Sequence, residues 1–287
     1  MQRGPQVSAE TTFTGMRGRY AAYRIRISND KGLSVTGRLL RPAGGGFTRR
    51  FPAVLLENGR ELNSRAVDFL PAEFGDVVVL SLDYPDELPY ELSIREILLQ
   101  SDRLRRASRR IAPMFSLGAD YLLARDDVDD SRLVIVASSF AVPFAVNAAA
   151  LDRRFVNVGL VYGAGNMAEV LGANLTIRPL WLRRAAAWVA MRPFAEFAPE
   201  RNVGRIAPRP VVMVNGIDDP QMPRSAVVAL YDAARPPKTL IWLRTGHLMP
   251  DDSALVRTLV DTTLALLPAL KDVAATRHRL APSSARQ

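Results

Sequence analysis

The chain of 287 residues contains no cysteine and only two histidines, His247 and His278. Without cysteine, disulfide bonds, thiol nucleophiles and thiolate metal sites are all excluded. Two histidines are too few for a histidine-rich metal centre. No run of about 18 apolar residues is present, so no membrane span is predicted.

The length and the start of the chain bound its organisation and its location. With 287 residues, of which 48% are hydrophobic, the chain is long enough for one large α/β domain or two small ones. The start, MQRGPQVSAETTFTG, lacks the apolar core of a secretion signal. We therefore expect a cytoplasmic protein.

The formal net charge of +9 can indicate nucleic acid or an anionic surface as partner. The densest basic run is RLRRASRR, residues 103–110, in a segment whose apolar residues recur at nearly helical spacing. The arginines then lie on the solvent side of a helix, and few aromatic residues near them are available to stack on bases. We expect a solvated helix face and no nucleic-acid partner, with a polyanion site as the alternative.

Hydrophobic patterning predicts a mostly parallel central sheet that begins with an antiparallel hairpin. Residues 20–29 and 33–42 alternate polar and apolar positions around a short turn. Buried strands are predicted at residues 51–56, 76–83, 133–137, 156–162, 211–214 and 239–243. Helices are predicted at residues 92–112, 115–125 (after a break at Pro113), 141–151, 224–234 and 251–267. This alternation implies an α/β fold with helices on both faces of the sheet.

The predicted elements divide the chain into three parts. We expect residues 1–19 to form a flexible polar arm, residues 20–270 to form the α/β domain, and residues 271–287 to form a frayed basic tail. Within the domain, residues 164–205 separate two core strands by more than an ordinary crossover needs. This insertion contains LTIRPLWLRRAAAWVAMRPFAEF. It is predicted to be helical, either packed on the core or lying as a basic amphipathic helix on a membrane surface.

A sharp turn between a strand and a helix is predicted around Ser139. Only Ser138, Ser139 and Phe140 separate the apolar run that ends at Ala137 from the next helix. The chain must reverse within about one residue, which puts a serine on the turn and leaves the next backbone N–H free to hold an oxyanion. Pro143 falls in the first turn of that helix, where a missing N–H costs nothing.

Residues 137–141, ASSFA, resemble the G-x-S-x-G nucleophile elbow of the α/β-hydrolase family, with alanine in place of both glycines. Alanine is the smallest substitute for glycine, so the turn can form with slight crowding. The resemblance covers residues 20–270. The hairpin and the stretch GRIAPRPVVMVNG bring it nearest to dienelactone hydrolases and acetyl esterases. It implies the α/β-hydrolase fold, with Ser139 as the nucleophile.

The order serine, acid, histidine that this family uses is also present. The turn NGIDDPQMP resembles the family's acid turn, in which an aspartate stands three residues after a glycine. Counting from Gly216 selects Asp219, with Asp218 as the alternative. His247 follows the last predicted strand, where the family places its catalytic histidine, whereas His278 lies in the basic tail and is expected to be solvated.

The resemblance also assigns the groups around the nucleophile. An oxyanion hole needs two donors, and the first is the backbone N–H of Phe140. The loop ENGR resembles the family's HG turn with Asn58 in place of histidine, which makes the backbone N–H of Arg60 the expected second donor. Residues 164–205 stand where the family carries a helical lid, so Trp181 and Trp188 are expected to contact substrate.

The function implied by the resemblance is hydrolysis of carboxylic esters by a serine, aspartate and histidine triad through an acyl-enzyme. Histidine takes the serine proton and the carboxylate fixes the histidine tautomer. The expected partner is a small-molecule ester, no metal or organic cofactor is required, and no membrane surface is expected as partner. Thioesterase, amidase or peptidase activity with the same triad is an alternative, as is a non-catalytic binding protein with this fold. Oligomeric state is left open.

Overall fold

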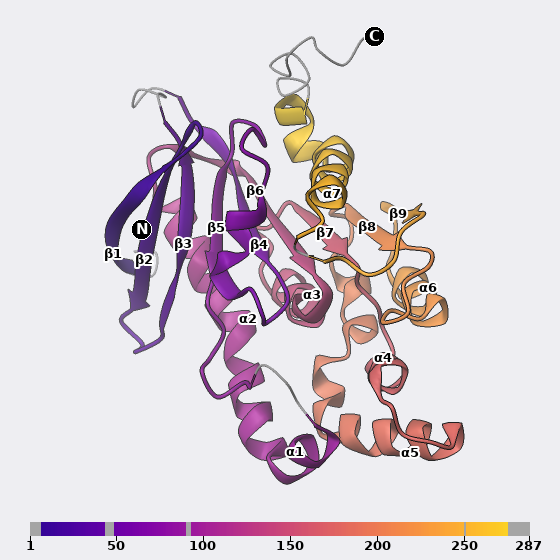
Figure 1. The fold of residues 1–287 in the computed structure, drawn as a ribbon. Helices are drawn as coiled ribbons and strands as arrows, with labels where there is room; N and C mark the ends of the chain where they lie inside the picture. The colour runs from indigo at the N-terminus through magenta and orange to yellow at the C-terminus, as the bar shows by residue number, and fades with distance from the viewer. Residues whose placement is uncertain (1–6, 44–48, 90–92, 250, 275–287) are drawn as a thin grey trace.

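The computed structural model describes residues 7–43, 49–89, 93–249 and 251–274. Its strands form one nine-stranded sheet in the order β1-β2-β3-β5-β4-β6-β7-β8-β9 (Figure 1). The strands are β1 (Val7–Arg17), β2 (Tyr20–Asn29), β3 (Ser34–Pro42), β4 (Phe51–Glu57), β5 (Val78–Leu82), β6 (Val128–Ser138), β7 (Asn157–Val161), β8 (Val211–Gly216) and β9 (Lys238–Leu243). The first three strands and β5 pair antiparallel, and all pairs from β5 onward are parallel. The predicted fold class is confirmed.

Helices cover both faces of this sheet. They are α1 (Ile94–Leu99), α2 (Ser101–Leu123), α3 (Val142–Leu151), α4 (Met167–Asn174), α5 (Leu180–Met191), α6 (Arg224–Ala233) and α7 (Ser253–Leu266). Short 3-10 helices are η1 (Asn63–Phe69), η2 (Ser139–Ala141), η3 (Arg192–Phe197), η4 (Pro199–Arg201), η5 (Val203–Arg205) and η6 (Pro268–Leu270).

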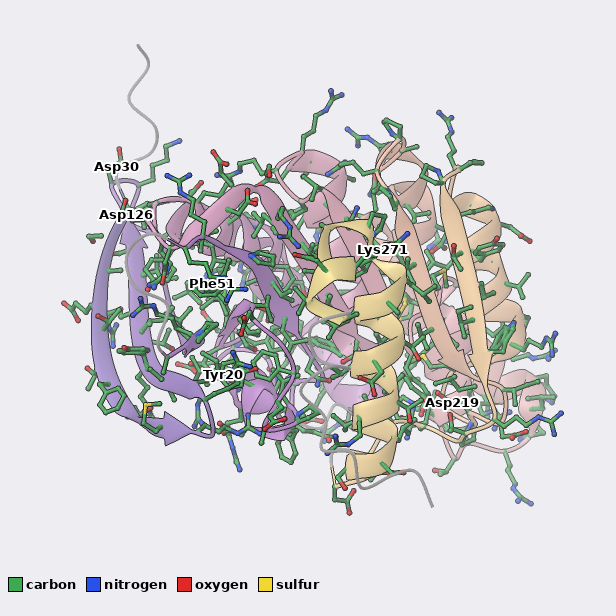
Figure 2. The ribbon with its side chains drawn as sticks, turned by 90° about the horizontal axis from the view of Figure 1, so that it is seen from above. Tyr20, Asp30, Phe51, Asp126, Asp219 and Lys271 are labelled. Carbon is green, nitrogen blue, oxygen red and sulfur yellow. The ribbon has the colours of Figure 1, made fainter. Side chains whose placement is uncertain are left out.

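The two faces of the sheet form separate hydrophobic cores because strand side chains alternate in direction. On β4, Leu55 belongs to the core shared with α2, α3 and α6. Its neighbour Val54 belongs to the core shared with α7 and η1. Figure 2, viewed from above, shows α7 in front of the strands. The carboxyl ends of β4, β6, β7 and β8 meet at one edge between these layers, where α/β sheets place their ligand sites.

Residues 7–17 form a strand, β1, so the prediction of a flexible arm over residues 1–19 is wrong there; residues 1–6 lie outside the described part. The strand pairs antiparallel with β2 along its length, although most of its side chains are exposed. Arg17 at its end donates to backbone carbonyls of η1 and the loop after it. Backbone pairing at a sheet edge, without core burial, leaves little apolar pattern to detect in the sequence.

Pro113 lies inside α2, so the predicted helix break at this residue is wrong. The break falls at Gln100 instead, between α1 and α2; Leu92, where the predicted helix begins, lies outside the described residues. An interior proline costs a helix about 3 kcal/mol. Around it, α2 buries Ile111, Met114 and Phe115 in the core, at roughly 1.5–3 kcal/mol each, which exceeds that cost.

The segment after α7 is ordered further than predicted. Residues 271–274, assigned to a frayed tail, are helical, and Val273 and Ala274 are buried. The preceding turn is held on the sheet because Arg132 donates to the Ala269 carbonyl and Asn157 accepts from the Ala269 N–H. Residues 275–287, including His278, lie outside the described part.

No single helix within the described ranges is long and apolar enough to cross a membrane. The segments Ser253–Leu266 and Pro268–Ala274 satisfy the length and composition only as a pair, with a bend of 104° between them.

We predict opposite effects from two glycine-to-alanine changes. Gly37 of β3 pairs with Leu82 of β5, and a Cβ at position 37 would overlap the Ser81 carbonyl oxygen. Gly37→Ala should therefore lower the free energy of unfolding by about 1–3 kcal/mol. Gly172 lies inside α4, where the nearest atom to an added Cβ is 3.7 Å away on Ala187, so Gly172→Ala should raise that free energy by roughly 0.5–1 kcal/mol.

Urea unfolding followed by circular dichroism measures both changes. Equal effects of the two substitutions would contradict the close approach of β3 to β5.

Candidate active site

Ser139 occupies the sharp turn between β6 and α3. Ser138 still has extended backbone angles, but Ser139 has φ of 50°. A positive φ is uncommon for a residue other than glycine and stores strain. Ala137 and Ala141, which stand where the glycine-flanked turn has glycine, are both fully buried. The turn therefore forms with alanine at both positions, and the strained residue in it is the serine that the sequence selects.

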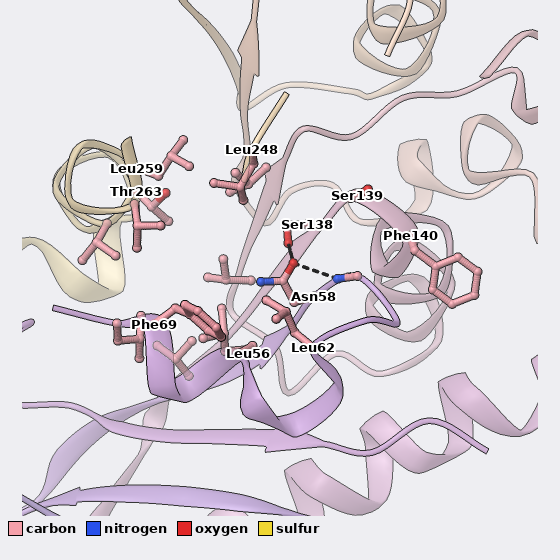
Figure 3. Close-up of a pocket in the computed structure, with 18 of the residues that line it drawn as sticks. Leu56, Asn58, Leu62, Phe69, Ser138, Ser139, Phe140, Leu248, Leu259 and Thr263 are labelled. Carbon is pink, nitrogen blue, oxygen red and sulfur yellow. Dashed lines mark hydrogen bonds between the residues drawn. The ribbon is translucent and has the colours of Figure 1, made fainter. Parts of the chain in front are cut away.

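Ser138, the other serine of the turn, is held by the loop after β4. Its hydroxyl donates to Asn58 Oδ1, which also accepts the Gly59 backbone N–H at 2.7 Å (Figure 3). This contact joins the ends of two neighbouring strands, and it engages the Ser138 hydroxyl. Sequence analysis did not predict it, although Asn58 in place of a histidine was the available signal.

Asp219 and His247 are hydrogen-bonded, with 2.7 Å between Asp219 Oδ2 and His247 Nδ1. The carboxylate is buried, and its Oδ1 accepts the backbone N–H groups of Gln221 and Met222 at 2.8 and 3.2 Å. Asp218, the alternative acid, is exposed. A carboxylate bound to Nδ1 favours the tautomer with hydrogen on that nitrogen, which leaves Nε2 as the basic nitrogen.

Two residues that sequence analysis missed position the His247 loop. The Tyr162 ring packs edge-on against the imidazole, with 5.5 Å between ring centroids, and its hydroxyl shares a 2.6 Å hydrogen bond with Thr245. Gly216 ends β8 beneath the same loop, and a Cβ there would lie 2.5 Å from the Thr245 carbonyl oxygen. The sequence places both residues at or just after the end of a buried strand, and Gly216 also belongs to the predicted acid turn.

One cavity of about 420 Å³ collects most of the residues selected from the sequence. Ser139, Phe140, Arg60 and His247 all line it. Asp219 lies behind His247 and is not in the lining. Figure 3 shows that residues from β4, η1, β6 and α7 surround the same space.

The loop from Asn58 to Arg60 lines the same cavity as Ser139, and Tyr84 holds this loop in place. The Tyr84 hydroxyl donates to the Asn58 carbonyl oxygen at 2.6 Å. The Tyr84 ring packs edge-on against Phe140, 5.4 Å away, and the Arg60 guanidinium lies 6.0 Å from the Phe140 ring centroid. These contacts link the predicted sources of both oxyanion donors.

No protein-family model and no curated protein sequence matches the chain. Solved structures do match. The acetyl xylan esterase from Paenibacillus sp. R4 is 16% identical and has a TM-score of 0.61 over 91% of this chain and 90% of that one. Acetyl xylan esterase 1 from Thermoanaerobacterium sp. JW/SL YS485 is 16% identical, with a TM-score of 0.59 over 90% and 88%. The α/β hydrolase GrgF from Penicillium sp. sh18 is 16% identical, with a TM-score of 0.57 over 94% and 99%. The chain has the α/β-hydrolase fold.

Residues 164–205 contain the helices α4 and α5 and the 3-10 helices η3 to η5. However, no described residue of 164–205 lines the cavity. Trp181 and Trp188 are 69% and 56% exposed on α5, which packs through Ala187 and Ala190 instead. Neither tryptophan lines the cavity at Ser139. An aromatic pattern alone does not distinguish a surface helix from a pocket lining.

A buried carboxyl group lies at the end of β4, directly before the loop from Asn58 to Arg60. Glu57 ends β4, and its Oε1 accepts the Leu82 backbone N–H at 3.1 Å. Burial raises the pKa of Glu57 well above its usual range, and the Asp83 carboxylate raises it further. Burial and the nearby Glu57 also raise the pKa of Tyr84.

We predict that Glu57→Gln makes the protein's stability less sensitive to pH. Folded Glu57 holds its proton above the ordinary glutamate pKa of about 4.3, so the folded state binds more protons than the unfolded state and stability falls as pH rises. Glutamine has no such proton and keeps an acceptor for Leu82. The melting temperature of Glu57→Gln relative to wild type should therefore rise between pH 5 and pH 8.

Thermal unfolding at both pH values measures this difference. Glu73→Gln, at an exposed position, controls for the loss of one carboxylate. A Glu57→Gln difference that is the same at pH 5 and pH 8 would contradict the raised pKa.

Proposed function

We propose that this protein is a serine hydrolase that cleaves carboxylic esters of small molecules. The observation that carries the proposal is the hydrogen bond between buried Asp219 and His247 at a cavity that Ser139, on a strained turn, also lines. No hydrogen bond joins Ser139 to His247 among the described residues, but a half-buried serine on a turn and an imidazole oriented by an acid line one cavity. These are the groups that activate a hydroxyl nucleophile.

The reaction follows from these groups. Ser139 Oγ attacks the ester carbonyl carbon while His247 Nε2 takes its proton, and Asp219 stabilises the imidazolium. The backbone N–H groups of Phe140 and Arg60 hold the oxyanion. The carbon–oxygen bond to the alcohol then breaks, and the alcohol leaves with the proton from His247. Water repeats the sequence on the acyl-enzyme and releases the carboxylic acid.

The names of similar structures favour an ester substrate. Two are acetyl xylan esterases, and another is a cold-adapted esterase from an Arctic intertidal metagenomic library, 13% identical with a TM-score of 0.54. This chain shares the fold with them. Its order of strand, serine turn, acid turn and histidine loop supports the same class of chemistry.

Separate alanine substitutions of the two adjacent serines, Ser138 and Ser139, should show which of them is the nucleophile. Ser139→Ala should lower kcat/KM for p-nitrophenyl esters by roughly 10³-fold or more. Ser138→Ala should lower it by no more than about tenfold, because it loses one hydrogen bond of about 1 kcal/mol to Asn58. Labelling with a fluorophosphonate should be lost only in Ser139→Ala.

Equal activity of Ser139→Ala and wild type would reject this nucleophile. Absence of both turnover and labelling in the wild type would favour a binding protein with the hydrolase fold.

The two adjacent aspartates provide a matched test of the acid. Asp219→Asn should lower kcat by about 10³- to 10⁴-fold, because an amide does not hold the histidine in the required tautomer. Asp218→Asn, at an exposed position, should stay close to wild type. Steady-state kinetics of the two variants measures this, and a larger loss in Asp218→Asn would reassign the acid.

A further inference from the structure

The cavity at Ser139 continues away from the reacting groups, between the sheet and α7. Four adjacent strands each contribute one valine to its floor: Val79 of β5, Val54 of β4, Val136 of β6 and Val161 of β7. These side chains are 3–8% exposed. Leu259, Thr263 and Leu264 of α7 line the opposite side. Figure 3 shows Leu259 and Thr263 projecting from α7 into this space.

The far end of this channel is closed. Val77, Phe74 and Leu270 line it there and are at most 2% exposed. Val78 pairs with Ala53 of β4, so Val77 lies about six residues before the level of Asn58 at the mouth. At about 3.3 Å per strand residue, the lining extends for roughly 20 Å.

The chemistry of the lining restricts what the channel holds. Polar lining residues cluster at the mouth, around Ser139 and His247, and beyond them Thr263 is the one polar side chain in the described lining. A sugar or a charged group would lose its hydration there without replacement hydrogen bonds. Protein interiors are close-packed, with few voids larger than a water molecule. A cavity of about 420 Å³ that is polar at the mouth beside Ser139 and apolar beyond it therefore has the features of a ligand site.

We propose that this channel binds the acyl chain of the ester, and that the chain is an unbranched aliphatic one of at least about eight carbons, which a channel of roughly 20 Å accommodates. The inference rests on the proposed function. The acyl group stays bonded to Ser139 Oγ after the alcohol leaves. A closed channel suits the part that stays, whereas it would retain an alcohol that must depart. An acetyl group would leave most of the channel empty.

A series of p-nitrophenyl esters from acetate to decanoate tests the chain length. Each added methylene buried in the channel should raise kcat/KM by about fourfold, and the rise should continue as far as octanoate and decanoate. An acetate optimum, with a steady fall for longer chains, would overturn the proposal.

Two threonines of α7 give a matched pair of variants. Thr263 lines the channel, whereas Thr258 is exposed on the outer face of the helix. Thr263→Phe should lower kcat/KM for octanoate by at least about tenfold and change that for acetate by less than about threefold, because a side chain of greater volume fills the channel. Thr258→Phe should change neither. Equal loss on acetate and octanoate in Thr263→Phe would contradict the proposal.

Binding measured without turnover separates this proposal from the proposed function. Ser139→Ala should bind decanoate in calorimetry, and adding Thr263→Phe should weaken that binding by at least about tenfold. Decanoate binding without ester turnover in the wild type would support binding of an aliphatic chain in the channel and contradict the proposed hydrolase function. Turnover of the acetate ester without decanoate binding would support the proposed hydrolase function and contradict binding of the acyl chain in the channel. Should Thr263→Phe not fold, Leu259→Phe places a ring in the same space, and the wild-type series decides independently.

Discussion

The parallel pairing of β4, β6, β7 and β8 is the constraint on which the site depends. In the registered ladder, Glu57 lies beside Ala137, Ser138 beside Val161, and Val161 beside Val214. Four strands therefore end at nearly the same level, and the loops that follow them converge. A shift of one residue in any pair would turn the side chains of that strand to the other face. It would also move a loop away from the others.

Hydrogen bonds between these loops then fix the positions of the loops relative to one another, in addition to the pairing of the strands. Ser138 joins the turn after β6 to Asn58 after β4, and Tyr162 after β7 joins the His247 loop through Thr245. Side chains thus join the loop after β4 to the turn after β6, and the end of β7 to the loop after β9. Such contacts restrict the loops that carry Ser139 and His247. In the proposed hydrolase they would hold the reacting groups in place before substrate binds.

Much of the fold and the order of the candidate residues could be predicted from local sequence. Ser139, Asp219 and His247 each follow a short, apolar, β-branched run, and the scarcity of histidine leaves few choices for the base. From the sequence, the candidate acid could be narrowed only to the adjacent residues Asp218 and Asp219, because the geometry of their turn decides which side chain points inward. In the structure, Asp219 meets His247 and Asp218 faces solvent.

The features that were missed depend on contacts between distant segments. The strand β1 forms because its backbone pairs with the edge of β2. Pro113 is tolerated inside α2 because this helix packs along the sheet. The channel is a space left between α7 and the side chains of four adjacent strands, β5, β4, β6 and β7. Those residues read in the sequence as ordinary core positions, and only their three-dimensional packing shows that the core is incomplete there.

The closed end of the channel gives the C-terminal turn a separate importance. Leu270 belongs to η6, which follows the last helix and contributes no strand to the sheet. In the proposed acyl site, the strand ends therefore fix the position of the reacting groups, and Leu270 in a peripheral turn fixes the length of acyl chain that the channel accepts. A single substitution at that turn would change the accepted length and leave Ser139, Asp219 and His247 in place. The proposed substrate range can then evolve independently of the proposed chemistry.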